Sequence, residues 1–104
     1  MAHKKSSNHI IYKLSNTITG EIYVGLTIAK HGRNYIRSVR GRFNRHVCRA
    51  NRESKDWNLC NSLRTYGRQS FTYDVLDVIR TKQVAHQVEL AYIKSLNPHL
   101  NSTL

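Results

Sequence analysis

Acidic residues are scarce in this chain of 104 residues, which has six Asp plus Glu against 17 Lys plus Arg and a formal net charge of +11. Such an excess of cationic side chains on a small domain is typical of proteins that bind polyanions, most often nucleic acid. A membrane surface attracts the same charge, but the chain has no lipidation motif. It also has no apolar run near the ~20 residues of a membrane span. We expect a nucleic-acid partner and no membrane.

Cysteine, proline and glycine are also few, at two, one and five residues. Cys48 and Cys60 do not make the disulfide framework of a small secreted domain, and residues 1–7 lack the apolar stretch of a secretory signal. His46 and His86 could be combined with the two cysteines into a zinc site, but the spacing matches no regular zinc module. With 39% hydrophobic residues the composition is globular. We expect reduced cysteines in one soluble, cytoplasmic domain.

Three β-prone runs and three amphipathic segments predict an α+β fold. The runs 10–15 and 21–26 alternate in polarity around a turn at Gly20, which predicts an antiparallel hairpin. A third run covers 71–79. We expect a small three-stranded antiparallel sheet flanked by helices. The helices are expected from about 38 or 41 to 50, from 54 or 56 to about 66, and from 81 to about 96.

Helical spacing of apolar residues predicts which face of each helix is buried. In the first helix the buried stripe is Val39, Phe43, Val47 and Ala50. In the second it is Trp57, Leu59, Cys60 and Leu63, and in the third Val84, Val88, Ala91 with Tyr92, and Ser95. Residues 1–9 are polar and basic, which predicts a flexible arm before a single domain of residues 10–104.

Lys and Arg concentrate between Lys30 and Lys55, where acids occur only at Glu53 and just beyond the segment. Arginine outnumbers lysine there, and its planar guanidinium suits bidentate binding of phosphate. A merely solvated basic face is the alternative. The residues expected to contact DNA are Lys30, Arg33, Arg37, Arg40, Arg45 and Arg49.

Four short motifs occur in order along the chain. Ile10-Ile11-Tyr12 is followed after ten residues by Tyr23-Val24-Gly25. Arg42 and His46 are spaced as Arg-x-x-x-His on the first predicted helix, Glu89 lies on the last one, and Leu100-Asn101 follows Pro98. Together they resemble the GIY-YIG endonuclease family, in small stand-alone members of the phage and bacterial type. The resemblance covers nearly the whole domain.

The resemblance implies an enzyme, a Mg²⁺-dependent endonuclease of the homing or restriction type that hydrolyses phosphodiester bonds of double-stranded DNA. It implies Mn²⁺ as a substitute metal, no small-molecule cofactor, and a bacterial or phage-infected host cell. The residues to which it assigns catalytic roles are Tyr12, Tyr23, Arg42, His46 and Glu89. Gly25 and Asn101 are assigned structural roles near the site. The chain departs from the family pattern in two ways. Ile10 replaces the first glycine, and the segment between Gly25 and Arg42 is longer than is usual in the family. We interpret 26–41 as a basic insertion that adds DNA contacts.

The chemistry of these residue types is consistent with that assignment. The guanidinium of Arg42 can bind the scissile phosphate through two parallel hydrogen bonds, and His46 lies one helical turn away on the same face. A single carboxylate such as Glu89 can hold Mg²⁺ with water filling the other ligand positions. A phenol needs its proton removed before it acts as a base, a role that we assign to Tyr12, with Tyr23 supporting it.

Two other functions stay open from the sequence. One is a non-catalytic basic module of the same fold that binds nucleic acid, and the other is an RNA-binding protein of the ribosomal type. Neither explains the family spacing of the five candidate catalytic residues. One active site cuts one strand, so a double-strand cut needs a homo-oligomer or sequential nicking.

Overall fold

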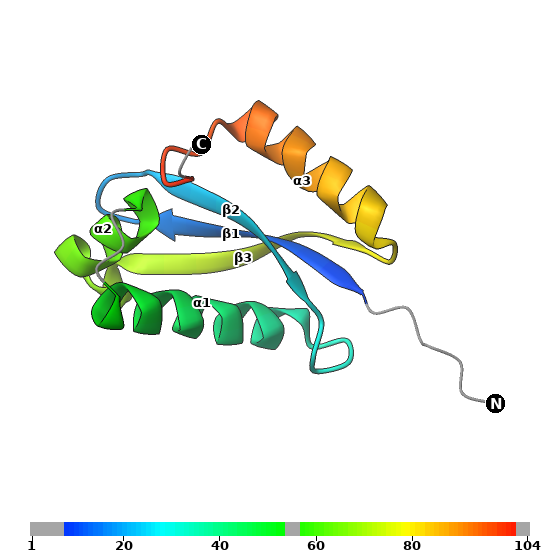
Figure 1. The fold of residues 1–104 in the computed structure, drawn as a ribbon, viewed down its shortest axis with the longest axis horizontal. Coiled ribbons are helices and arrows are strands. Elements are labelled where there is room, and N and C mark those ends of the chain that lie inside the picture. The colour runs from blue at the N-terminus through cyan, green and yellow to red at the C-terminus, as the bar shows by residue number, and fades with distance from the viewer. Residues whose placement is uncertain (1–7, 54–56, 102–104) are drawn as a thin grey trace.

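The computed structural model describes residues 8–53 and 57–101 and has an α+β architecture in three layers (Figure 1). Its strands are β1 (His9–Asn16), β2 (Ile22–Ile28) and β3 (Phe71–Ile79). Its helices are α1 (Tyr35–Arg52), α2 (Asn58–Tyr66) and α3 (Lys82–Leu96), with a short 3-10 turn at Arg68–Ser70. The prediction of a three-stranded antiparallel sheet flanked by helices is confirmed.

The sheet has the order β2-β1-β3, so β1 is central and β2 is an edge strand. In the register of the hairpin Tyr12 is opposite Gly25 and Leu14 is opposite Tyr23. The pairing of β1 with β3 shifts between Ile11 and Tyr12. A bulge of this kind twists the sheet locally and changes the direction of neighbouring side chains, and here it lies beside Tyr12.

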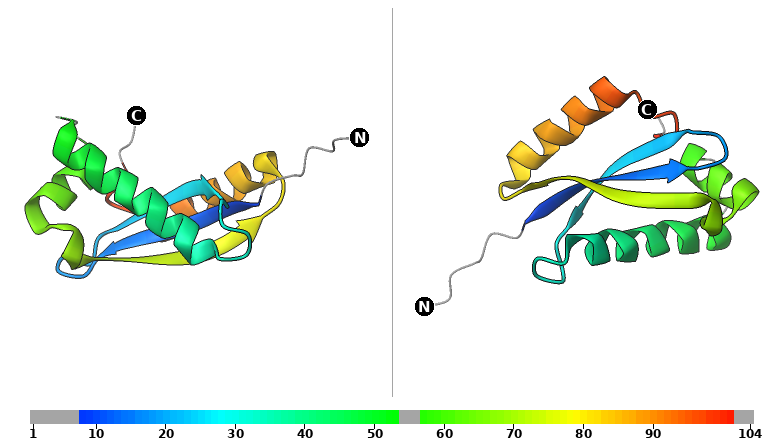
Figure 2. Two further views of the ribbon diagram at one scale, coloured as in Figure 1. Left: turned by 90° about the horizontal axis from the view of Figure 1, so that it is seen from below. Right: turned by 180° about the vertical axis from the view of Figure 1, so that it is seen from behind.

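Helices α1 and α3 cover opposite faces of the sheet (Figure 2). On the α1 side the core contains Ile10, Tyr12 and Leu14 from β1, packed with Val39 and Phe43. Because side chains alternate along a strand, Ile11 and Val24 point to the α3 side, where they are fully buried. Among the described residues no helix is long and apolar enough to cross a membrane.

Helix α1 is longer than predicted, since it begins at Tyr35 and includes Gly41 in its interior. The side chain of Asn34 accepts a hydrogen bond from the Arg37 backbone N–H at 3.2 Å and thereby caps the helix start. The segment 26–41 that was expected to be an insertion is therefore divided between the end of β2, a loop at 29–34 and the first turns of α1.

The expected boundary between the N-terminal arm and the domain differs from the structure. Residues 1–7 lie outside the described residues, and so do positions 54 and 56, where the second helix was expected to begin. Asn8 donates from its side chain to the Tyr35 hydroxyl at 3.1 Å, and His9 already belongs to β1, so the folded domain includes both. Trp57 is at the N-cap of α2 and is exposed, so its predicted burial is wrong. The guanidinium of Arg49 lies over its ring instead.

The predicted buried stripe of α3 is also wrong. Ala85 is the buried residue of this helix, and Val84 is 44% exposed. Of the other predicted residues, Val88 and Tyr92 are half-buried, while Ala91 and Ser95 are exposed. Apolar residues occur on every side of α3, so their spacing did not identify the buried face. The small side chain of Ala85 lets that face of the helix approach the sheet. The observed rotation turns Glu89 partly inward.

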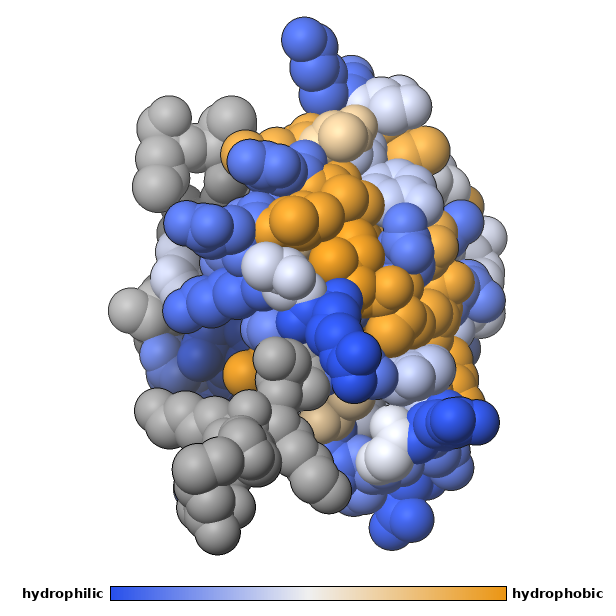
Figure 3. All heavy atoms as spheres, turned by 90° about the vertical axis from the view of Figure 1, so that its right-hand side faces the viewer, coloured by the Kyte–Doolittle hydropathy of each residue, from blue (hydrophilic) through white to orange (hydrophobic). Residues whose placement is uncertain are grey.

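Apolar side chains also reach the surface at one end of the molecule. Figure 3 views the end where α1 and α3 begin and shows apolar side chains side by side among hydrophilic ones. Ile28, Ile36 and Val84 are between 44% and 46% exposed and lie at the ends of β2, α1 and α3 that meet there.

Candidate active site

Three rings from three elements meet between the sheet and α1. The Tyr12 hydroxyl lies 2.8 Å from Nε2 of His46, a buried hydrogen bond that joins β1 to α1. The ring centroids of Tyr12 and Tyr23 are 6.1 Å apart, and those of Tyr23 and His46 are 5.2 Å apart with the rings edge to face. The hairpin register and the position of His46 on α1 therefore bring together three residues that are distant in sequence.

Gly25 makes this ring cluster sterically possible. A Cβ atom at position 25 would lie 2.5 Å from both Cζ and the hydroxyl oxygen of Tyr12, and 2.8 Å from Cε2 of Tyr23. Real Cβ atoms do not approach other atoms so closely, and the contacted groups are held in a packed core. The glycine of the second motif is thus explained by the ring that lies over it.

We expect Gly25→Ala to lower the free energy of unfolding by about 1–3 kcal/mol, because the added methyl group must displace the Tyr12 ring. The matched control is Gly41→Ala on α1, where an added Cβ meets no atom within 4 Å. That change should raise stability by roughly 0.5–1 kcal/mol through helix propensity. Urea unfolding of both variants measures the difference, and equal effects would contradict the steric explanation.

Asn101 supports the edge strand that carries Tyr23. Its side-chain oxygen accepts from the Val24 N–H at 2.9 Å and its amide nitrogen donates to the Val24 carbonyl at 2.8 Å. The backbone N–H of Leu100 donates to the Ile22 carbonyl at 2.9 Å. The segment after α3 therefore pairs with the first half of the free edge of β2 and holds this part of the strand next to the ring cluster.

A pocket of about 200 Å³ opens beside the ring cluster. We call it the catalytic pocket, because three of the candidate catalytic residues line it. Its wall combines two arginines with an imidazole and a phenol, and its complete lining is Tyr23, Arg42, His46, Arg49, Trp57, Leu59, Cys60, Leu100 and Asn101. Tyr12 is not part of this lining, because its side chain is fully buried beneath the pocket.

Burial and charge set the protonation states in this pocket. Burial, together with the charges of Arg42 and Arg49, lowers the pKa of His46 to about 4. Burial raises the pKa of Tyr12 far above its ordinary value, and it also raises the pKa of Tyr23. The guanidinium of Arg42 opposes the rise at both phenols. At neutral pH the imidazole is uncharged and both phenols keep their protons, so a neutral hydrogen bond joins the Tyr12 hydroxyl to Nε2 of His46.

The lowered pKa of His46 predicts a loss of stability in acid. Between pH 6.5 and about 4 the unfolded chain binds a proton at this position and the folded chain does not, so stability falls as pH falls. The loss attributable to His46 amounts to about 3 kcal/mol. Urea unfolding of the wild type and of His46→Asn between pH 7 and pH 4 isolates it, because other titrating groups are common to both. The same pH dependence in both proteins would contradict the assignment.

Glu89 lies on α3, on the other side of the sheet from α1, and it is not part of the pocket lining. Its side chain is 20% exposed, and burial raises its pKa, an effect that the nearby His86 reduces. The carboxylate is 3.7 Å from Nδ1 of His86. Its negative charge raises the pKa of Tyr23. Helix α3 packs against β2, the strand that carries Tyr23, so the charge of Glu89 acts on this phenol from the neighbouring element.

The residues expected to contact DNA lie on two sides of α1. Arg45 and Lys30 line a pocket that also includes Arg42, whereas Arg37 and Arg40 lie with Tyr73 on the side towards β3. Arg49 lines the catalytic pocket, Arg33 is exposed in the loop before α1, and all six side chains are exposed or half-exposed.

Sequence reasoning missed several residues around the site. Trp57, Leu59 and Leu100 line the catalytic pocket, although the first two were expected in the core and Leu100 was considered only as the neighbour of Asn101. Helical periodicity separates a buried face from an exposed face and does not identify residues that border a pocket. The zinc site considered from the sequence is not formed, because the structure between residues 8 and 101, apart from 54–56, has no cluster of three or more His, Cys, Asp or Glu. Cys60 is buried and Cys48 is exposed.

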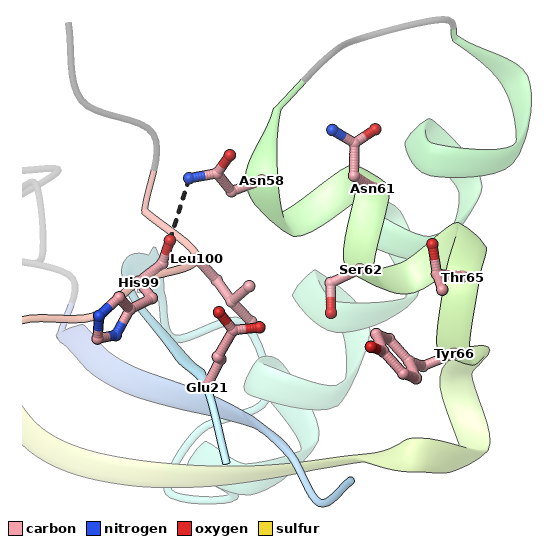
Figure 4. Close-up of a pocket in the computed structure, with 8 residues that line it drawn as sticks. All are labelled: Glu21, Asn58, Asn61, Ser62, Thr65, Tyr66, His99 and Leu100. Atoms are coloured by element: carbon pink, nitrogen blue, oxygen red, sulfur yellow. Dashed lines mark hydrogen bonds between the residues drawn. The ribbon is translucent and has the colours of Figure 1, made fainter. Parts of the chain in front are cut away.

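A larger pocket of about 270 Å³ lies between the β1–β2 turn, α2 and the segment after α3. Figure 4 shows Glu21, Asn58, Asn61 and Tyr66 around it, with the Asn58 side chain donating to the His99 carbonyl at 3.1 Å. None of its lining residues is Lys or Arg, although it shares Leu100 with the catalytic pocket. It is not suited to a phosphate group.

Comparisons with known proteins identify the fold and the family. No curated protein matches the chain. A solved structure, the catalytic domain of intron endonuclease I-TevI in a mutant with one glutamate replaced by alanine, aligns with a TM-score of 0.69 at 24% identity. The alignment covers 93% of this chain and 92% of that one, and it shows a shared fold. The model of the GIY-YIG catalytic domain matches residues 8–102. Because this match spans most of the length of the chain, the chain belongs to the GIY-YIG catalytic domain family and is a nuclease domain.

Proposed function

We propose that this protein is a divalent-metal-dependent endonuclease that hydrolyses phosphodiester bonds of double-stranded DNA. The observation that carries the proposal is the convergence of Tyr23, His46 and Arg42 on one pocket. The charge of Glu89 raises the pKa of the Tyr23 phenol in this pocket. Hydrolysis of a phosphodiester needs a positioned phosphate, a nucleophilic water with a proton acceptor, and groups that stabilise the developing charge.

Arg42 and Arg49 supply the positive charge that receives the scissile phosphate. Both guanidinium groups line the catalytic pocket together with the uncharged imidazole of His46. Guanidinium groups bind phosphate oxygens in a bidentate way and stabilise charge that develops in the transition state. Arg49 is held by Glu53 at 3.5 Å and by the ring of Trp57, with its Cζ 5.6 Å from the ring centroid.

Tyr23 is the phenol that we assign to the nucleophilic water, in place of Tyr12. Tyr23 lines the pocket, whereas Tyr12 is fully buried and engaged with His46. A general base must reach the proton that it removes, directly or through one water molecule. We therefore propose that Tyr12 positions His46 and the Tyr23 ring, and that Gly25 and Asn101 hold these rings in place.

Glu89 is the residue that fits a hard divalent cation such as Mg²⁺, or Mn²⁺ in its place. Its carboxylate is under-solvated, as its raised pKa indicates, and a nearby cation would relieve that condition. With one carboxylate the ion would keep most of its ligand positions for water and phosphate oxygens. When bound, such an ion activates water and neutralises charge on phosphate oxygens.

Double-stranded DNA is the proposed partner, and the basic side of α1 that faces β2 is its proposed contact surface. Arg42, Arg45 and Arg49 follow one another along this side, with Lys30 at its end. The prediction that Arg33, Arg37 and Arg40 also contact DNA stays a prediction, with the last two placed towards β3. We further propose site-specific cutting of the homing or restriction type in a bacterial or phage-infected cell, with a homo-oligomer or sequential nicks for a double-strand cut.

Incubation with supercoiled plasmid tests the proposal. The wild-type protein should convert supercoiled DNA to nicked or linear DNA in the presence of Mg²⁺ or Mn²⁺, and EDTA should prevent the conversion. Binding without any conversion under either metal would contradict the proposal and leave the non-catalytic module. Preference for RNA over duplex DNA at a stated salt concentration would favour the RNA-binding alternative, because backbone attraction alone depends steeply on salt for both.

A further inference from the structure

A second pocket, of about 130 Å³, lies beside the catalytic pocket between α1 and the end of β2. We call it the flanking pocket, and its lining is Thr27, Lys30, His31, Ser38, Gly41, Arg42 and Arg45. Arg42 lines both pockets. The two are therefore neighbours that share one guanidinium group.

The flanking pocket has the composition of an anion site. Lys30, Arg42 and Arg45 bring three cationic side chains to a small volume, and none of its lining residues is acidic. Ser38 accepts a hydrogen bond from the Lys30 backbone N–H at 2.9 Å, which fixes the start of the 29–34 loop against α1. By contrast, the larger pocket of Figure 4 has no Lys or Arg and contains a carboxylate. The positive charge is thus concentrated at particular pockets.

Gly41 keeps the flanking pocket open at a cost to the helix. A glycine inside a helix destabilises it by roughly 0.5–1 kcal/mol relative to alanine. Packing does not require glycine at this position, because an added Cβ meets no atom within 4 Å. Its φ is not in the positive range either. Because Gly41 has no side chain, space is left beside Arg42 and Arg45 in the flanking pocket.

The two pockets follow each other along α1 with the repeat of the helix. The α1 residues of the catalytic pocket are Arg42, His46 and Arg49, and those of the flanking pocket include Ser38, Arg42 and Arg45. The shift of about one turn corresponds to roughly 6 Å along the axis. A DNA strand that places one phosphate in the catalytic pocket continues with another phosphate a short step away.

We propose that the flanking pocket binds the backbone phosphate adjacent to the scissile phosphate on the same DNA strand. This inference rests on the proposed function, because it takes the catalytic pocket to hold the scissile phosphate. The flanking pocket then fixes the strand on one side of the cut, and Arg42 bridges the two phosphates. Such a second anchor positions the scissile bond without taking part in its hydrolysis.

Titration with inorganic phosphate, followed by NMR, tests the site without DNA or cleavage. Amide signals of Lys30, Gly41 and Arg45 should shift and saturate in the wild type. In Gly41→Leu, whose added side chain fills the pocket without removing charge, the signals of Lys30 and Arg45 should not shift. Unfolding temperatures establish that this variant stays folded. If phosphate shifted the signals in Gly41→Leu as much as in the wild type, the proposal would be overturned. Wild-type shifts confined to other parts of the protein would also overturn it.

Binding of duplex DNA gives the second test, in the Glu89→Gln background so that the DNA is not cut. Gly41→Leu and Arg45→Gln should each weaken binding about tenfold, and Arg45→Gln should reduce the salt slope by about one unit. The matched controls are Asn51→Leu, on the opposite side of α1 from Arg42, and Lys82→Gln, on α3. Both should stay within about twofold of the background protein.

Different results would contradict the proposed function and the proposed role of the flanking pocket. If the wild type does not nick plasmid with any divalent metal, the proposed function is wrong, whatever the binding measurements give. If the wild type nicks plasmid and Gly41→Leu and Arg45→Gln both bind duplex DNA as tightly as the controls, the flanking pocket alone is wrong.

Discussion

Glu89→Gln should lower the rate of plasmid nicking by about a thousandfold at saturating Mg²⁺ while leaving DNA binding at least as tight as in the wild type. The carboxylate is the single acid whose charge reaches the Tyr23 phenol from α3. An ion held there supplies several kcal/mol of charge stabilisation, and 1.36 kcal/mol corresponds to tenfold in rate. Binding does not suffer, because the substitution removes a negative charge that repels phosphate.

Glu21→Gln is the matched control for Glu89→Gln. Glu21 lines the larger polar pocket, which contains none of the candidate catalytic residues. This control should therefore nick plasmid within a few-fold of the wild-type rate. Equal losses in the two variants, or full activity in Glu89→Gln, would contradict a specific role for the carboxylate on α3.

The second large effect separates the two tyrosines. Tyr23→Phe should reduce the cleavage rate about a hundredfold or more, in the range expected for removal of a general base. Because the raised pKa of Tyr23 keeps its phenol protonated at neutral pH, the wild-type rate should rise with pH through the neutral range. In Tyr23→Phe this rise should disappear, so the pH–rate profile identifies the role as well as the size of the effect.

Tyr12→Phe should act differently, through stability. It removes the hydrogen bond to Nε2 of His46 and leaves that buried nitrogen without its partner. Such a loss costs about 1–3 kcal/mol of folding free energy. The pH dependence of cleavage should remain, with a smaller loss of rate than in Tyr23→Phe. The reverse result, a flat pH profile in Tyr12→Phe alone, would restore Tyr12 as the base.

Much of the fold could be predicted because its local signals agree. The alternation around Gly20 and the run 71–79 identified the strands, and β3 has the predicted bounds. The face of α3 could not be predicted, since Val84, Leu90 and Leu96 make its exposed side nearly as apolar as its buried side. Only packing against the sheet decides which side is turned inward.

The candidate site was predictable as a set of residues but not as an arrangement. Motif spacing selected Tyr12, Tyr23, Arg42 and His46, which the structure brings together. The difference in exposure between the two tyrosines arises because β1 is the central strand, β2 is an edge strand, and α1 covers that side of the sheet. These are tertiary features, and no pattern in the separate segments contains them.

The central claim is that the carboxylate of α3 and the pocket between α1 and β2 form one metal-dependent site. Paramagnetic broadening by Mn²⁺ tests it most directly and needs no cleavage. Signals of Glu89, Tyr23 and His46 should broaden together at low Mn²⁺ concentration, and Glu89→Gln should abolish the broadening of all three. Broadening at Glu89 that leaves Tyr23 and His46 sharp, or broadening of those two that persists in Glu89→Gln, would contradict a single shared site.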